Sequence, residues 1–116
     1  MSLRGILCIP LIFICLSQSG DLLAAPSAKE YSFEIRFSEH HFTPQTLVVP
    51  SEQPLLLTVV NSSRERIEFE SIKLNREKVV GPGETITLHL PPLHAGSYDF
   101  YDDFHQDVPE GVILAK

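Results

Sequence analysis

Apolar and polar residues alternate along several short segments of the chain. Residues 31–37 read Tyr-Ser-Phe-Glu-Ile-Arg-Phe, with an apolar side chain at every second position. Residues 66–71 and 84–90 alternate in the same way, and residues 55–60 form a short apolar run. Successive side chains of a strand point to opposite faces, so this period of two predicts half-buried strands. The apolar side chains at positions such as Ile35, Phe69 and Leu88 are therefore expected in the core.

Segments rich in proline, glycine and polar residues separate these strands. Turns are predicted at 38–44, 51–54, 61–65 and 81–83. Residues 72–80 show no clear period, and a short helical turn before Val79 stays open there. Seven or eight short strands, spaced by roughly 8–12 residues with turn signals between them, are typical of an all-β fold. The prediction is an antiparallel Greek-key β-sandwich or barrel.

The N-terminal residues carry the pattern of an export signal. One arginine precedes an almost wholly apolar run over residues 5–16, and small residues follow at Ala24 and Ala25. The run is shorter than the roughly 20 residues that span a bilayer, although a membrane anchor is the alternative reading. We expect a cleaved signal peptide at 1–25, a folded domain at 29–116 and a periplasmic protein.

The cysteines and the charge limit the chemistry of the mature chain. Both cysteines, Cys8 and Cys15, lie in the predicted signal, so the mature domain is expected to have neither a disulfide nor a thiolate ligand. The net charge is −6, and acidic residues crowd the C-terminal segment. Such a surface repels nucleic acid and attracts cations.

One stretch, residues 97–111, concentrates the candidate chemistry. Tyr98 and Phe100 alternate with polar neighbours, and a loop dense in carboxylates and one imidazole follows before Gly111. Residues 112–114 then predict a closing strand. Carboxylate and imidazole groups bind hard or borderline metals. The alternative is an acidic, solvated loop whose histidine points at water.

The order of several motifs resembles the cupredoxins. These are Phe42-x-Pro44 before a Val-Val-Pro strand, Asn61 after the next strand, Glu68-Phe69-Glu70, Arg76-Glu77 ahead of Pro82-Gly83, and Leu93-x-x-Gly96-x-Tyr98-Asp99-Phe100. The resemblance covers residues 31–116 and is strongest to the EfeO-type cupredoxin-like domain of periplasmic iron-uptake proteins. It implies a metal-binding protein that handles iron or copper beside a ferrous-iron permease of the inner membrane and passes or oxidises the ion.

The chain departs from the blue-copper proteins of that family. Those proteins would have cysteine where Asp102 stands, a second histidine near Ile67 and a methionine near Glu110, so that only His105 is in place. A blue-copper site needs two histidines and a thiolate. The sequence therefore predicts a site of oxygen and nitrogen donors with no intense blue absorption.

The resemblance places the candidate ligands at one end of the sandwich. Imidazole and carboxylate together suit iron, Cu(II), Mn(II) or Zn(II). His40 is as well placed for metal binding as its neighbour His41. Glu77 is expected to pair with Arg76 or Lys78 instead. Asp102 and Asp103 are adjacent, so their side chains cannot both point the same way on a strand. The predicted metal ligands are His105, Asp102, Asp103, Glu68, Glu70, His41 and Glu110.

Two further functions compete with metal handling. One is a non-catalytic interaction module that partners a membrane iron permease and keeps a degenerate metal site. The other is a mononuclear-metal enzyme, which ranks last because no nucleophile–base pair can be placed. The sequence also leaves a homodimer open.

Overall fold

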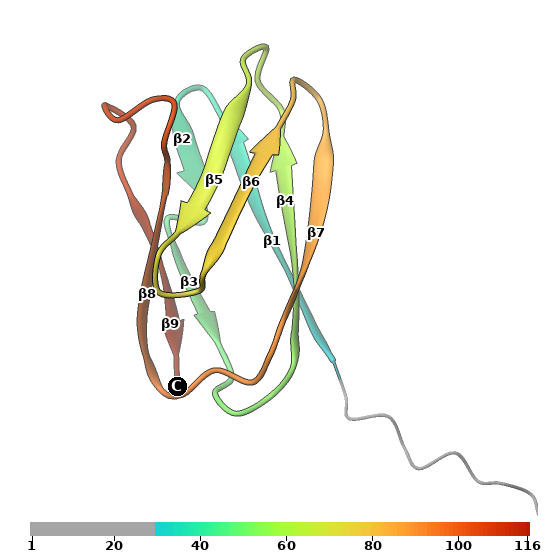
Figure 1. The fold of residues 1–116 in the computed structure, drawn as a ribbon, viewed down its shortest axis with the longest axis vertical. Helices are drawn as coiled ribbons and strands as arrows, with labels where there is room; N and C mark the ends of the chain where they lie inside the picture. The colour runs from blue at the N-terminus through green and yellow to red at the C-terminus, as the bar shows by residue number, and fades with distance from the viewer. Residues whose placement is uncertain (1–29) are drawn as a thin grey trace, which may run out of the picture.

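The computed structural model describes residues 30–116, in which nine strands and no helix are present (Figure 1). The predicted signal peptide at 1–25 lies outside the described residues. Within the described part, no helix is long and apolar enough to cross a membrane. The strands are β1 (Tyr31–Ser38), β2 (His41–Thr43), β3 (Thr46–Val49), β4 (Leu55–Asn61), β5 (Ile67–Ser71), β6 (Arg76–Val80), β7 (Thr85–Leu90), β8 (Gly96–Asp102) and β9 (Gly111–Ala115).

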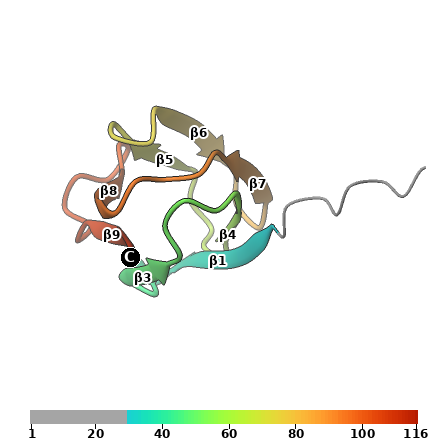
Figure 2. The ribbon, with the colours of Figure 1, turned by 90° about the horizontal axis from the view of Figure 1, so that it is seen from below.

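The strands form two facing sheets, which Figure 2 shows from below. One sheet has the order β2-β1-β4-β7 and the other β3-β9-β8-β5-β6. The all-β sandwich is thus confirmed, but the sheets are mixed rather than wholly antiparallel, because β1 pairs with β4 and β3 with β9 in parallel. The chain leaves the first sheet after β2, forms β3 in the second sheet and returns as β4. This crossover brings β1 and β4 into the sheet in the same direction.

Aromatic side chains fill the centre of the sandwich. Phe42 packs edge-on against Phe37 and Phe100, with ring centroids 5.1 Å apart in both pairs. Phe69 stacks on Phe100 at 5.3 Å. The predicted core positions Ile35 and Phe69 are fully buried, while Leu88 packs against the core and stays half-buried. Full burial of one such side chain is worth about 1.5–3 kcal/mol, so this cluster holds the two sheets together.

The structure defines one segment that the sequence left open and corrects one predicted turn. Residues 72–75 form a turn, and residues 76–80 then pair with β5 as strand β6, with Ile67 opposite Val80. The predicted turn 38–44 contains the short strand β2, because Glu39 and His40 take positive φ values of 51° and 59° and reverse the chain within two residues. That tight reversal places Phe42 opposite Phe37, where both rings enter the core.

Candidate metal centre

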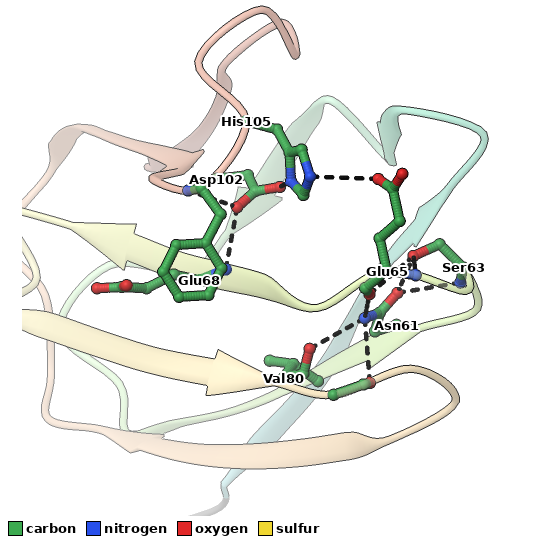
Figure 3. A network of polar contacts seen from close by, with 9 residues as sticks. Asn61, Ser63, Glu65, Glu68, Val80, Asp102 and His105 are labelled. Carbon is green, nitrogen blue, oxygen red and sulfur yellow. Dashed lines mark hydrogen bonds and ion pairs between the residues drawn. The ribbon is translucent and has the colours of Figure 1, made fainter.

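A buried carboxylate, Asp102, organises the loop end of the sandwich. Asp102 ends β8, and its side chain is 0% exposed. Its Oδ1 accepts hydrogen bonds from the backbone N–H groups of Glu68 and Phe104, each at 3.0 Å. Its Oδ2 accepts a bond from Nδ1 of His105 at 2.6 Å. Asp102 thus joins β5, β8 and the loop that follows β8 (Figure 3).

His105 lies between two carboxylates. Its Nδ1 faces Asp102, and its Nε2 lies 3.2 Å from Oε2 of Glu65 in the β4–β5 loop. The hydrogen bond to Asp102 is the main cause that raises the pKa of His105, and partial burial opposes this shift. The charges of Asp102, Glu65 and Asp107 raise it further. The arrangement therefore favours an imidazolium that donates from both ring nitrogens.

The fully buried Asn61 holds the β4–β5 loop in the shape that presents Glu65. Its Nδ2 donates to the carbonyls of Glu65, Val80 and Gly81 at 2.7, 3.0 and 3.0 Å. Its Oδ1 accepts from the N–H and the hydroxyl of Ser63. Every donor and acceptor of this side chain is used, as Figure 3 shows, so the loop is fixed from within the protein.

A second group of carboxylates lies on the outer face of the five-stranded sheet. Glu68 and Glu70 come from β5, and Asp103 directly follows β8. One oxygen from each lies within 4.8 Å of the others. Glu68 is only 7% exposed, although it carries a carboxylate. We call Glu68, Glu70 and Asp103 the carboxylate cluster.

Glu77 on β6 adds a fourth acidic group beside the cluster. It stands directly opposite Glu70, an arrangement that destabilises a sheet when both groups are charged. A hydrogen bond to Glu77 is the main cause that raises the pKa of Glu68 to about 7, and burial and the neighbouring carboxylates add to it. A hydrogen bond between two carboxyl groups needs a proton, so Glu68 keeps its proton to a higher pH than an ordinary glutamate.

Tyr101 borders the cluster from β8. It stands opposite Glu70 and forms a side-chain hydrogen bond with it. Burial is the main cause that raises the pKa of Tyr101, and the hydrogen bond to Glu70 adds to it. The neutral phenol is therefore a donor to the cluster.

The structure divides the predicted ligands between the two sides of β8. Asp102 points inward to His105 and Asp103 points outward, as expected for adjacent residues of a strand. Glu68 extends away from His105 in Figure 3 and joins Glu70 and Asp103 on the outer face. The single site predicted from the sequence is thus two separate groups.

The remaining predicted ligands, His41 and Glu110, lie outside both groups. His41 is exposed, and its Nδ1 donates to the carbonyl of Glu39 at 2.7 Å. It is His40 whose ring lies beside that of His105, with centroids 6.2 Å apart. Glu110 lines an open hollow of about 330 Å³ next to Asp103 and Tyr101.

Sequence reasoning missed the roles of Glu65 and Glu77. Glu65 sits in a polar turn whose residues carry no periodic pattern, so nothing indicated that it faces His105. Glu77 was expected to pair with a neighbouring cation, yet it contacts Glu68. The alternation of Glu68 and Glu70 about the buried Phe69 was the signal for an acidic outer face, and the pairing of β6 with β5 adds Glu77 to it.

The two mixed sheets form a small β-sandwich of the class that includes copper proteins. The chain belongs to the cupredoxin-like domain family, whose model matches residues 5–115. A curated relative, the uncharacterized protein RP394 of Rickettsia prowazekii, is 40% identical over 83 residues. That match covers 72% of this chain and 66% of the relative, so the chain spans slightly less than two thirds of that protein's length.

Solved structures show the same fold at low identity. A reduced auracyanin from Roseiflexus castenholzii matches with a TM-score of 0.65 at 16% identity, over 78% of this chain and 99% of that one. The purple cupredoxin of Nitrosopumilus maritimus gives 0.56 at 16% identity, over 72% and 98%. The metal-binding domain of the Cu(I)-exporting ATPase CopA of Streptococcus pneumoniae D39, solved with Cu(I), gives 0.62 at 12%, over 78% and 98%. The fold is therefore related to that of copper-binding proteins.

The residues of this chain do not fit a blue-copper ion. The resemblance to blue-copper proteins expects a cysteine where Asp102 stands and a second histidine near Ile67, which is fully buried and offers no ligand atom. Both nitrogens of His105 already face carboxylate oxygens. Within residues 30–116 no cysteine can supply the thiolate that such an ion needs, and Ile67 cannot supply an imidazole.

Proposed function

We propose that this protein binds iron at the carboxylate cluster and takes part in iron uptake or handling. The observation that carries the proposal is the meeting of three carboxylates from β5 and β8 within 4.8 Å, one of them on the nearly buried Glu68. A buried carboxylate surrounded by other carboxylates is costly unless a proton or a cation compensates it. The raised pKa of Glu68 reflects this cost, because the hydrogen bond to Glu77, burial and the neighbouring carboxylates disfavour its charged form.

The donor set favours iron over copper as the cargo. All three groups of the cluster offer oxygen, and the hydroxyl of Tyr101 is bonded to Glu70. Hard cations prefer carboxylate oxygen, whereas copper proteins use sulfur and imidazole ligands. Copper remains the second candidate ion, because its divalent form also accepts oxygen and nitrogen donors.

The proposed cellular setting rests on the resemblance to EfeO-type cupredoxins and on the predicted signal peptide. In that setting the protein works in the periplasm and delivers iron to a permease of the inner membrane. The cluster is open on one side, which suits such a role, because Asp103 is exposed to solvent and Glu70 is half-buried, whereas Glu68 is nearly buried. A cargo ion can then enter and leave without opening the core.

Binding at the cluster should depend on pH in the neutral range. The pKa of Glu68 lies near 7, so at lower pH a cation must displace the proton that this carboxylate holds. We expect the affinity for Mn(II), used as an air-stable substitute for Fe(II), to fall by about tenfold for each pH unit below 7. Loss of the free Mn(II) electron paramagnetic resonance signal, measured from pH 5.5 to 8, checks this slope. An affinity that is flat over this range would exclude Glu68 as a ligand.

Neutral substitutions in the cluster should weaken binding directly. We expect Glu70→Gln and Asp103→Asn each to lower the affinity for Mn(II) and for Fe(II) at least tenfold, or about 1.4 kcal/mol. Each change removes one charged oxygen donor but keeps the shape of the side chain. Calorimetric titration under anaerobic conditions measures both ions.

Asp107→Asn is the matched control for these substitutions. Asp107 is an exposed acidic residue of the β8–β9 loop outside the carboxylate cluster, so its neutralisation should change affinity less than twofold. If the parent protein binds neither ion, or if Asp107→Asn weakens binding as much as Asp103→Asn, the cluster is not a specific site. The interaction module would then be the better proposal.

A further inference from the structure

We infer that the position at which the resemblance to blue-copper proteins expects the copper ion is closed in this protein by a hydrogen-bonded clip of Asp102, His105 and Glu65. These contacts link the loops in place of a metal. The inference concerns the inner side of β8 and does not depend on iron binding at the outer face. His105, where the resemblance expects a metal ligand, instead binds two carboxylates.

The geometry leaves no ring nitrogen of His105 free. Nδ1 lies 2.6 Å from Asp102 and Nε2 lies 3.2 Å from Glu65. A metal at either nitrogen would have to displace one of these carboxylates. Displacing Asp102 is the more costly change, because its side chain is fully buried and would keep an uncompensated charge.

The other oxygen of Asp102 is committed as well. Oδ1 accepts the backbone N–H groups of Glu68 and Phe104. Rotating this carboxylate toward an ion would leave two N–H donors without their acceptor, and an unsatisfied buried donor is costly. Both oxygens of Asp102 therefore serve as acceptors within the protein, and a metal could bind this side chain only by disturbing these hydrogen bonds.

The clip links separate loops, as side chains bound to one metal ion would do. It fastens the β8–β9 loop to β5 through Glu68 and to the β4–β5 loop through Glu65 (Figure 3). The loop is also wound tightly, because His105 N–H donates to the carbonyl of Asp102 at 3.2 Å. With Asp102 held inward in this way, Asp103 is directed to the outer face, where its N–H bonds the carbonyl of Glu68 at 3.0 Å.

Nitrogen NMR of the histidine rings tests the clip in the intact protein. One equivalent of Cu(I), added anaerobically at pH 7, or of Zn(II) should leave the chemical shifts of both ring nitrogens of His105 unchanged, because both nitrogens face carboxylate oxygens. Exposed rings such as those of His40 and His41 report adventitious binding in the same spectrum. A coordination shift of either nitrogen of His105 with the first equivalent of Cu(I) or Zn(II) would overturn the inference.

Thermal unfolding supplies the second measurement. His105→Gln and Glu65→Gln should each lower the midpoint by several degrees, and the double variant should lower it by less than the sum, since both remove the same link. His94→Gln is the matched control, because His94 also meets a glutamate at 2.9 Å, but with 92% of its side chain exposed. The clip is refuted if the two single effects add in full, or if neither exceeds that of His94→Gln. Failure of Mn(II) and Fe(II) binding at the outer face would leave all these outcomes unchanged.

Discussion

Gly111→Ala should destabilise the protein by about 3 kcal/mol, which is large for the addition of one methyl group. A Cβ at this position would lie 2.1 Å from Cζ of Phe100, the residue paired with Gly111 across β8 and β9. Phe100 cannot move aside, because its ring is fully buried against Phe42 and Phe69. Urea unfolding followed by circular dichroism measures the loss.

Two further variants separate steric overlap from other effects of the substitution. Phe100→Leu in the Gly111→Ala background should recover part of the stability, because a smaller side chain leaves room for the methyl group. Gly83→Ala tests backbone strain alone, since this glycine has a φ of 69° and a Cβ added to it would meet no atom within 4 Å. Its expected effect is about 1–2 kcal/mol. A Gly111→Ala protein as stable as the parent would mean that Phe100 is packed differently.

The core residues, and the faces to which strand side chains point, could be predicted because they follow from the period of two. Alternation about Ile35 and Phe69 identified residues that the structure buries completely. The same rule required Asp102 and Asp103 to point to opposite faces, and they do. Patterns with a period of two are set by the strand itself, so one sequence suffices to detect them.

The contacts between the imidazole and carboxylate side chains could not be predicted, because they depend on how separate segments of the chain meet. The adjacent residues His40 and His41 look equivalent in the sequence, and only the tight turn with its positive φ values decides that His40 lies beside His105. Glu77 meets Glu68 only because β6 pairs with β5, and residues 72–80 carry no pattern that indicates this strand. Site geometry here is set by register and turns, not by residue type.

Asp102→Ala should lower the free energy of unfolding by about 3 kcal/mol, because three buried or half-buried hydrogen-bond donors lose their shared acceptor. The N–H groups of Glu68 and Phe104 lose their acceptor, and His105 loses the stronger of its two carboxylates. The loop after β8 should then become mobile. Faster amide hydrogen exchange at Phe104 and His105, together with the urea midpoint, measures the change.

The neighbouring aspartate provides the contrasting variant. Asp103→Asn should change stability by less than about 0.5 kcal/mol, because this exposed side chain lies among other carboxylates and its charge is not compensated. It should weaken Mn(II) binding at least tenfold, because it removes a charged oxygen donor from the carboxylate cluster. The two residues are adjacent in the chain, so opposite outcomes would separate the structural inner side of β8 from its proposed binding side. Equal losses of stability in Asp102→Ala and Asp103→Asn would contradict this division, because they would show that both aspartates serve the same structural contact.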